Sequence, residues 1–411
     1  MSHPHTPDSR YAWTRLGLTL VAMTIGSSAM YVVSVVLPTV QAEFGVARAD
    51  ASAPYTALMV GFGLGGVWMG KQADRHGVRR ALLIGAAGLG LGYVASGLAG
   101  GIGAFTLWHG LLLGFFGASA SFAPLVTDAS LWFVRRRGIA VAVCASGNYL
   151  AGAIWPPIVQ PLVQAWGWRP TYVGLGLLCL LTLPLLAQAL RERPPAAQAS
   201  PAAALRGAHP SERPFGLSIH QALVLLCIAG TACCVAMAMP QVHIVAYCSD
   251  LGYGVARGAE MLSLMLAAGI ASRLVSGAIC DRIGGLRTLL LGSALQGLAL
   301  LLFLPFDGLV SLYVISALFG LFQGGIVPSY AIIVREHFPA AAAGTRVGTV
   351  IMFTLLGMAL GGWMSGKVFD LTGSYDAAFV NGIAWNALNL AIAGWLLWRT
   401  RRLARGAAVA A

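Results

Sequence analysis

The chain contains 411 residues, of which 58% are hydrophobic and 10% are charged, and its formal net charge is +12 at pH 7. Soluble domains carry roughly 25% charged residues, so this composition excludes a soluble fold, which would be unable to hide so much apolar surface. A basic excess is also typical of nucleic-acid-binding proteins, but no basic stripe with interleaved aromatic residues accompanies it. No nucleic-acid partner is therefore expected.

Apolar stretches recur from one end of the chain to the other, and a helix of about 20 residues crosses the ~30 Å hydrocarbon core of a bilayer. The first stretch is longer than a signal-peptide core and lacks an A-x-A cleavage site, so it is predicted to be a retained span. The expected fold is an all-α integral membrane protein. Its twelve transmembrane helices are predicted at residues 16–40, 53–70, 81–100, 104–130, 138–162, 170–190, 219–247, 258–280, 288–305, 309–334, 345–367 and 377–398.

The positions of the basic residues predict the topology. Of 26 Lys and Arg residues, 21 lie in the N-terminal segment and in alternate loops, four lie in the other loops, and the last is Arg273. Lys and Arg are enriched in the cytoplasmic loops of membrane proteins. Both termini and the segment between spans 6 and 7 are therefore expected to be cytoplasmic, in a multi-pass protein of the cytoplasmic (inner) membrane.

A short motif occurs twice, at an offset of 207, after span 2 and again after span 8. This duplication predicts two pseudo-symmetric six-helix bundles, at residues 1–190 and 219–411, with a central cavity lined by spans 1, 4, 5, 7, 8, 10 and 11. Residues 191–218 are rich in Pro, Ala and charged residues, which is typical of a linker. The matched residues are Gly70, Asp74, Arg75, Gly77 and Arg80 in the first copy and Gly277, Asp281, Arg282, Gly284 and Arg287 in the second.

The duplicated motif resembles the G-x-x-x-D-R-x-G-x-R-R loop signature of the major facilitator superfamily, and the resemblance covers essentially the whole chain. Within that superfamily the chain is similar to the monocarboxylate porter group, which includes bacterial oxalate/formate exchangers. The resemblance implies carboxylate transport by alternating access. The residues that carry the narrower similarity are Trp132, Phe133, Arg136, Arg137 and Gly138 before span 5, Gly167, Trp168 and Arg169 before span 6, His243, Tyr247, Asp250 and Gly252 near the end of span 7, Arg273 with Asp281 and Arg282, and Phe369, Asp370, Gly373, Ser374 and Tyr375 before span 12.

The repeated loop motif is predicted to be a gating latch. Its glycines let helix ends and backbone approach closely, while Asp74 and Arg75 can hydrogen-bond across the interface between the halves. Asp128, at the cytoplasmic end of span 4, is placed to join this cluster. The same residues would equally serve to hold a helix–loop–helix in place, and the sequence leaves both roles open.

Arg273 is the one charged residue that lies deep inside a predicted span, in the apolar run at residues 261–280. A charge at the middle of a membrane helix costs at least ~2.5 kcal/mol and normally faces a cavity or a partner on a substrate path. Its repeat counterpart is Gly66, so the arginine is not part of the duplicated framework. A guanidinium matches a carboxylate bidentately, and in the resembling family an arginine on span 8 binds the substrate carboxylate. We therefore expect Arg273 to bind substrate; the alternative is an arginine tied to helix carbonyls or to a neighbouring side chain.

Polar side chains on spans 1, 5, 7 and 10 are the predicted neighbours of this arginine in the substrate site, because helical spacing groups them on common faces. Each would equally serve as a polar contact between helices. These residues are Tyr31, Asn148, Tyr149, Gln241, His243, Gln323 and Tyr330.

The sequence contains no arrangement that predicts catalysis, a metal site or a cofactor. Its seven cysteines lack C-x-x-C spacing, and no Ser/His/Asp or paired-carboxylate set is present. The GFGLGG run at residues 61–66 imitates a nucleotide-binding loop but lies inside span 2, where close helix packing explains it. The chain is therefore predicted to be a transporter and not an enzyme.

The charges within the spans predict the substrate and the coupling ion. Oxalate exchangers of the resembling group carry a lysine on span 11, whereas residues 347–362 contain neither Lys nor Arg. One fixed positive charge balances one carboxylate, so small or aromatic 2-oxo or 2-hydroxy monocarboxylates are expected. Import of a monoanion opposes the membrane potential by ~2.3 kcal/mol per 100 mV, and a co-transported proton removes this term. His243 is the candidate proton carrier.

Two other functions fit the same fold, namely a carboxylate or dicarboxylate exchanger and a drug efflux transporter. Drug efflux is disfavoured because no acidic residue lies deep in a span to bind a cation. The expected partners are a small carboxylate, protons and the lipid bilayer, and the protein is expected to act as a monomer.

Overall fold

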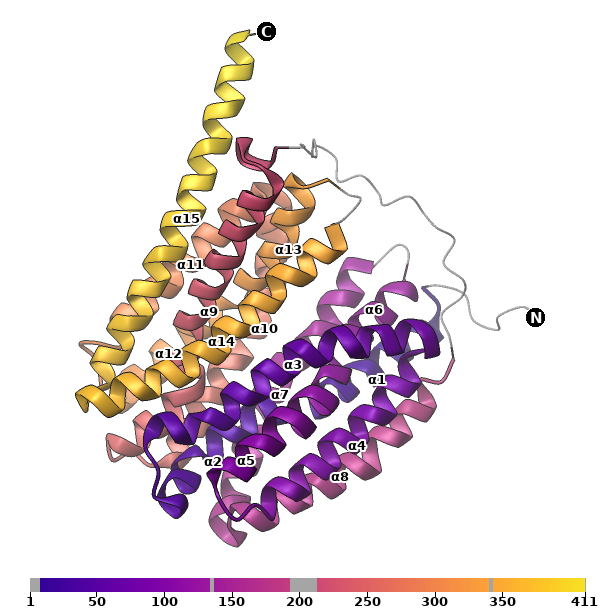
Figure 1. Ribbon diagram of the computed structural model, residues 1–411, viewed down its shortest axis with the longest axis vertical. Helices are drawn as coiled ribbons and strands as arrows, with labels where there is room; N and C mark the ends of the chain where they lie inside the picture. Colours follow the sequence, from indigo (N-terminus) through magenta and orange to yellow (C-terminus); the bar gives the residue numbers. More distant parts are fainter. Residues whose placement is uncertain (1–7, 134–136, 193–212, 340–342, 411) are drawn as a thin grey trace.

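The structure, a computed structural model, describes residues 8–133, 137–192, 213–339 and 343–410. Two helical bundles lie side by side, with the N-terminal half in indigo to magenta and the C-terminal half in rose to yellow (Figure 1). Within the described residues, all regular elements are helices. The predicted all-α fold of two bundles is confirmed.

The N-terminal half makes six membrane crossings. The first combines α1 and α2, which meet at Ser27, and the fourth combines four shorter segments. The elements are α1 (Arg10–Gly26), α2 (Ser28–Phe44), α3 (Arg48–His76), α4 (Val78–Gly97), α5 (Ile102–Trp108), η1 (His109–Gly117), η2 (Ala118–Ser121), α6 (Ala123–Leu131), α7 (Arg137–Trp166) and α8 (Trp168–Ala189).

The C-terminal half repeats this plan, and its fourth crossing is again divided, into α12 and α13. The elements are η3 (Pro214–Gly216), α9 (Ile219–Asp250), α10 (Val255–Ile283), α11 (Gly285–Leu302), α12 (Leu309–Gln323), α13 (Ile326–His337), α14 (Ala343–Thr372) and α15 (Tyr375–Ala410). Residues 193–212 lie outside the described part, so the domain division at 191–218 stays a prediction.

These crossings coincide with the twelve predicted spans. Among the described residues, eleven stretches are long and apolar enough to cross a membrane. The remaining crossing, α3, has 29 residues but is less apolar, because glycines and polar residues interrupt its hydrophobic run. Large apolar side chains such as Leu181, Leu185 and Val310 are more than two-thirds exposed. Such exposure is expected of helices whose outer faces meet lipid.

The fourth crossing, predicted as one regular helix, is irregular. A π-helix over His109–Gly117 leads into a 3₁₀ turn over Ala118–Ser121 before α6 begins. Helix α3 packs closely on this stretch, since a Cβ at Gly61 would lie 2.1 Å from the carbonyl oxygen of Gly110. The glycine-rich run at 61–66 therefore allows close helix packing, and a π-helix within a crossing is a feature that recurs at functional sites.

Both copies of the loop motif lie at the same end of the molecule. Helices α3 and α10 run in parallel from the end that carries Arg48 and Val255 to the opposite end, where Gly77 and Gly284 terminate them. The two glycines have nearly the same backbone conformation, with φ 84° and ψ 164° at Gly77 and φ 82° and ψ 162° at Gly284. A positive φ of this kind favours glycine. We refer to these two ends as the Arg48 end and the Gly77 end.

The halves meet mainly along three helix pairs, which are α3 with α14, α7 with α10, and α2 with α9, and α2 also contacts α10. Near the Arg48 end the first pair is tightly packed, because a Cβ at Gly366 would lie 3.0 Å from the backbone of Ala49. Towards the Gly77 end, a Cβ at Gly66 of α3 or at Gly348 of α14 would meet nothing within 4 Å. The halves are thus joined at the Arg48 end and separate towards the Gly77 end.

Candidate functional site

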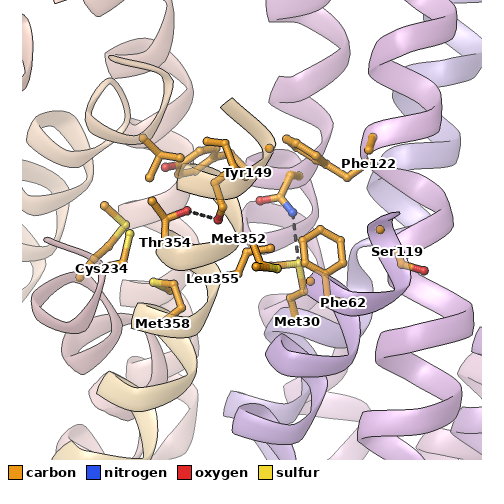
Figure 2. Close-up of a pocket in the computed structure, with 18 of the residues that line it drawn as sticks. Met30, Phe62, Ser119, Phe122, Tyr149, Cys234, Met352, Thr354, Leu355 and Met358 are labelled. Carbon is orange, nitrogen blue, oxygen red and sulfur yellow. Dashed lines mark hydrogen bonds between the residues drawn. The ribbon is translucent and has the colours of Figure 1, made fainter. Parts of the chain in front are cut away.

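A cavity of about 350 Å³ lies between the two halves, where α3 and α14 separate. Figure 2 shows the violet helices of the N-terminal half on one side of it and the tan helices of the C-terminal half on the other. Every span predicted to line a central cavity contributes to it, and span 2 contributes as well. The span 2 residues, all on α3, are Phe62, Gly63, Gly66 and Val67.

Arg273 of α10 lines this cavity and is partly buried. Its Nη1 donates to the carbonyl oxygen of Ala145 on α7, 3.0 Å away, and its Nε lies 3.5 Å from the carbonyl oxygen of Gly324. Its Cζ lies 4.2 Å from the ring centroid of Tyr149, also on α7. No acidic side chain among the described residues forms an ion pair with it. Carbonyl dipoles and a π face therefore hold the guanidinium.

A glycine one turn before the arginine makes room for this arrangement. A Cβ at Gly269 would come within 2.7 Å of Cε1 of Tyr149, so only a residue without a side chain lets the ring approach α10 here. Gly320 allows α12 to approach the same helix, since a Cβ there would lie 1.8 Å from the carbonyl oxygen of Met265. The position of Arg273 thus depends on close backbone packing around α10.

Four further residues predicted to bind substrate line the same cavity: Tyr31, Asn148, Tyr149 and Gln241. The hydroxyl of Tyr31 donates to Oδ1 of Asn148 at 2.8 Å, and Nδ2 of Asn148 donates to the sulfur of Met30 at 3.2 Å. In the other half, Nε2 of Gln241 donates to Oε1 of Gln323 at 2.9 Å. Gln323 itself lies outside the cavity lining and holds Gln241 from behind.

The remaining two predicted residues, His243 and Tyr330, also lie outside the cavity lining. The imidazole of His243 is fully buried, and its Nε2 lies 2.8 Å from the carbonyl oxygen of Gly362 on α14. The hydroxyl of Tyr330 donates to Oδ1 of Asn389 at 2.8 Å. Both side chains connect helices within the C-terminal half, which is the alternative role that the sequence left open.

Most of the cavity surface is apolar, and sequence reasoning did not identify these residues. Ile351, Leu355 and Met358 lie at positions i, i+4 and i+7 of α14 and so share one helical face. This periodicity is visible in the sequence, but an apolar face is equally typical of a helix that packs or meets lipid. The other apolar lining residues, several of them labelled in Figure 2, include Met30, Phe62, Phe122, Met237 and Met352.

Asp128, which was expected to join the loop motif, pairs with a residue of its own half. Its carboxylate accepts hydrogen bonds from Nε and Nη2 of Arg15 on α1, at 3.1 and 2.9 Å, and both side chains are almost fully buried. Nη2 of Arg15 also donates to the carbonyl oxygen of Leu190. This pair ties α1 to α6 and to the end of α8. The side chains of Asp74 and Asp281 lie outside the described part, so the latch stays a prediction.

Other residues of the predicted latch are exposed or lie beside contacts that were not predicted. Next to Gly284, the backbone N–H of Gly285 at the start of α11 donates to Glu336 at the end of α13, at 3.1 to 3.2 Å. Gly70 and Gly277 have open space beside them. Arg136, which contributed to the resemblance, lies outside the described residues. The motif arginines with exposed side chains are Arg75, Arg80, Arg282 and Arg287.

Comparison with known protein families shows to which family the chain belongs. The sequence profile described as Major Facilitator Superfamily matches residues 19–310 and 224–409. The chain belongs to this superfamily. It is similar to monocarboxylate transporter 13 of Bos taurus, with 28% identity over 310 residues that cover 75% of this chain and 71% of the relative. It is also similar to monocarboxylate transporter 11 of Homo sapiens, with 30% identity over 322 residues that cover 75% of this chain and 66% of the relative.

Solved structures of transporters share the fold of this superfamily member. A bacterial homologue of the human lysosomal transporter Spinster has a TM-score of 0.70 at 13% identity, and the match covers 96% of this chain and 98% of that one. The peptide transporter POT has a TM-score of 0.71 at 14% identity, covering 93% and 94%. The predicted fold and the resemblance to monocarboxylate porters are therefore confirmed.

Proposed function

We propose that this superfamily member is a secondary transporter that moves organic monocarboxylates across the cytoplasmic membrane by alternating access, in symport with protons. The observation that carries the proposal is the guanidinium of Arg273, which lines a cavity between the halves and has carbonyl and π partners among the described residues. The similarity to monocarboxylate transporters 11 and 13 supports the same class of substrate.

A carboxylate would bind Arg273 by replacing a weaker partner. A carboxylate brings a full negative charge and can form two parallel hydrogen bonds with a guanidinium, whereas a carbonyl offers only a dipole. A substrate oxygen therefore competes well with the carbonyl oxygen of Ala145. Because Ala145 belongs to the N-terminal half and Arg273 to the C-terminal half, this exchange of partners also changes a contact between the halves. Substrate binding would thereby shift the balance between conformations, as alternating access requires.

The charges of the cavity favour monocarboxylates. Arg273 is the one charged residue among the described residues that line it. A single carboxylate leaves the site neutral, whereas a dianion would leave one charge unpaired at a cost on the order of several kcal/mol. Adaptable side chains such as Met352 and Met358 form much of the remaining surface. An aromatic or otherwise apolar body on a 2-oxo or 2-hydroxy acid would fit against them.

The basic residues support one orientation in the membrane. Exposed arginines gather at the Gly77 end, which supports a cytoplasmic location for that end. In this orientation the cavity lies on the cytoplasmic side of the closed Arg48 end. A co-transported proton would offset the ~2.3 kcal/mol per 100 mV that opposes import of a monoanion. The placement of His243 against Gly362 favours packing, so proton uptake would involve another group.

Uptake into proteoliposomes tests the proposal. Labelled pyruvate, lactate or phenylpyruvate should accumulate under an inward proton gradient, and oxalate should accumulate much less. Arg273→Lys keeps the charge but loses the planar fork. We expect it to lower uptake by about 10-fold to 100-fold, the range for losing ~1.5–3 kcal/mol of hydrogen bonding to a charged group. The matched control is Arg257→Lys on the same helix, where the exposed arginine pairs with Glu260 at 3.0 Å.

The outcomes separate the alternatives. Normal uptake by both arginine variants would assign Arg273 to helix packing. Exchange of dicarboxylates without a response to the proton gradient would replace the proposal with a carboxylate exchanger. Proton-driven export of organic cations would instead identify a drug efflux transporter.

A further inference from the structure

Arg48, the first residue of α3, is inserted from the N-terminal half into a pocket of the C-terminal half. Its side chain is 7% exposed. Nη2 donates to Oδ2 of Asp250 at the end of α9, 2.8 Å away, and Nη1 donates to the hydroxyl of Tyr375 at the start of α15, 2.7 Å away. Cζ lies 5.0 Å from the ring centroid of Phe369 and 5.8 Å from that of Tyr375. The protein itself thus balances the charge of this arginine.

A carboxylate of the C-terminal half also caps the start of α3. The N-cap residue, Ala47, has no side chain able to do so. Instead, Oδ1 of Asp370 accepts from the backbone N–H of Arg48 and Oδ2 accepts from that of Ala49, each at 2.8 Å. The first N–H groups of a helix have no partner within the helix and carry partial positive charge. If the halves part at this end, α3 loses its cap. We call Asp250, Phe369, Asp370 and Tyr375 the Arg48 socket.

Further contacts between the halves continue from the socket towards the cavity. The hydroxyl of Thr56 on α3 donates to the carbonyl oxygen of Ala359 on α14 at 2.9 Å. On the neighbouring pair of helices, Ser263 of α10 donates to the carbonyl oxygen of Ala153 on α7. The socket therefore stands at the end of a continuous closed interface, with the cavity behind it.

We propose that Arg48 and its socket form the gate that closes the cavity at the Arg48 end, and that this end opens only when Arg48 leaves the socket. Two sequence segments that carried the resemblance, around Asp250 and at residues 369–375, thereby acquire a role outside the cavity. Charged side chains suit a reversible contact, because water solvates them once the halves part, whereas exposed apolar surface would be unfavourable. The gate would act with any substrate, so the inference goes beyond the proposed carboxylate specificity.

Electron–electron double resonance between spin labels at Leu98 and Val310 tests the gate. Both side chains are exposed at the Arg48 end, one in each half, and a ketone-bearing unnatural amino acid carries each label so that the native cysteines stay in place. Arg48→Gln should add a longer distance, with the ratio of long to short distances raised about tenfold, the factor for losing a hydrogen bond to a charged group. Asp370→Asn should shift the ratio in the same direction.

The matched control is Arg257→Gln, which breaks an exposed ion pair at the same end but within one half, between Arg257 and Glu260 at 3.0 Å. It should leave the distances unchanged. Wild-type distances in both Arg48→Gln and Asp370→Asn would overturn the gate. If neither variant folds, Tyr375→Phe, which removes only the hydroxyl acceptor, replaces them. Wild-type distances in Tyr375→Phe would then overturn the gate. No substrate enters the measurement, so its failure is distinguishable from failure of the carboxylate proposal.

Discussion

Arg48 and Arg273 both reach across the interface between the halves, but their surroundings differ. Arg48 is buried against the carboxylate of Asp250, a tyrosine hydroxyl and two aromatic rings. Arg273 lines a cavity and contacts backbone carbonyls and one ring. A guanidinium whose charge the protein balances holds two surfaces together, whereas one bound only by dipoles stays available to an anion. This difference supports the two proposals, that Arg48 closes the cavity and that Arg273 binds the substrate.

The largest effect on uptake is expected from placing a carboxylate near Arg273, as Asp250 is placed near Arg48 in the socket. Asn148→Asp would place a carboxylate among the lining residues, where it competes for the arginine and repels the substrate. A like charge about 5 Å away costs roughly 3 kcal/mol at an effective dielectric constant of ~20, so initial uptake of a monocarboxylate should fall about 100-fold. Asn148→Leu, of similar size and uncharged, should have a much smaller effect. Equal losses in the two variants would show that charge is not the determinant.

A smaller effect should follow from moving the aromatic partner of Arg273. The added methyl group of Gly269→Ala would meet Tyr149 at 2.7 Å and displace its ring. A cation–π contact contributes ~0.5–2 kcal/mol, so the KM for uptake should rise about twofold to thirtyfold. Gly174→Ala on α8 is the control, because a Cβ there meets nothing within 4 Å. An unchanged KM in Gly269→Ala would remove Tyr149 from the account of the site.

The helices and the place of Arg273 in the cavity lining could be predicted from the sequence because the relevant signals are local. A span is recognised from the length and hydropathy of one continuous stretch, and Arg273 stands out because its neighbours in the chain are apolar. Which polar residues face the cavity is not a local property. Asn148 and His243 both interrupt apolar helices, yet Asn148 lines the cavity and His243 packs against Gly362. The rotation of each helix, set by its partners, decides between these roles.

The sequence contains no local signal that predicts the Arg48 socket. The side-chain and backbone partners of Arg48 lie 202 to 327 residues away in the chain. An arginine at the start of a helix is common in proteins. In the sequence, Arg48 is one of four basic residues in the loops that carry few basic residues. Only the three-dimensional arrangement joins it to Asp250 and Asp370, and only there does its difference from Arg273 become visible.

Equilibrium binding of labelled phenylpyruvate to the purified protein tests most directly whether the two arginines divide binding and closure between them. Arg273→Lys should weaken binding by about tenfold or more, because the bidentate hydrogen bonds are lost. Arg48→Gln should stay within about threefold of the wild-type affinity, since it changes only the populations of conformations that bind. Wild-type affinity in Arg273→Lys, or equal losses in both variants, would contradict the account.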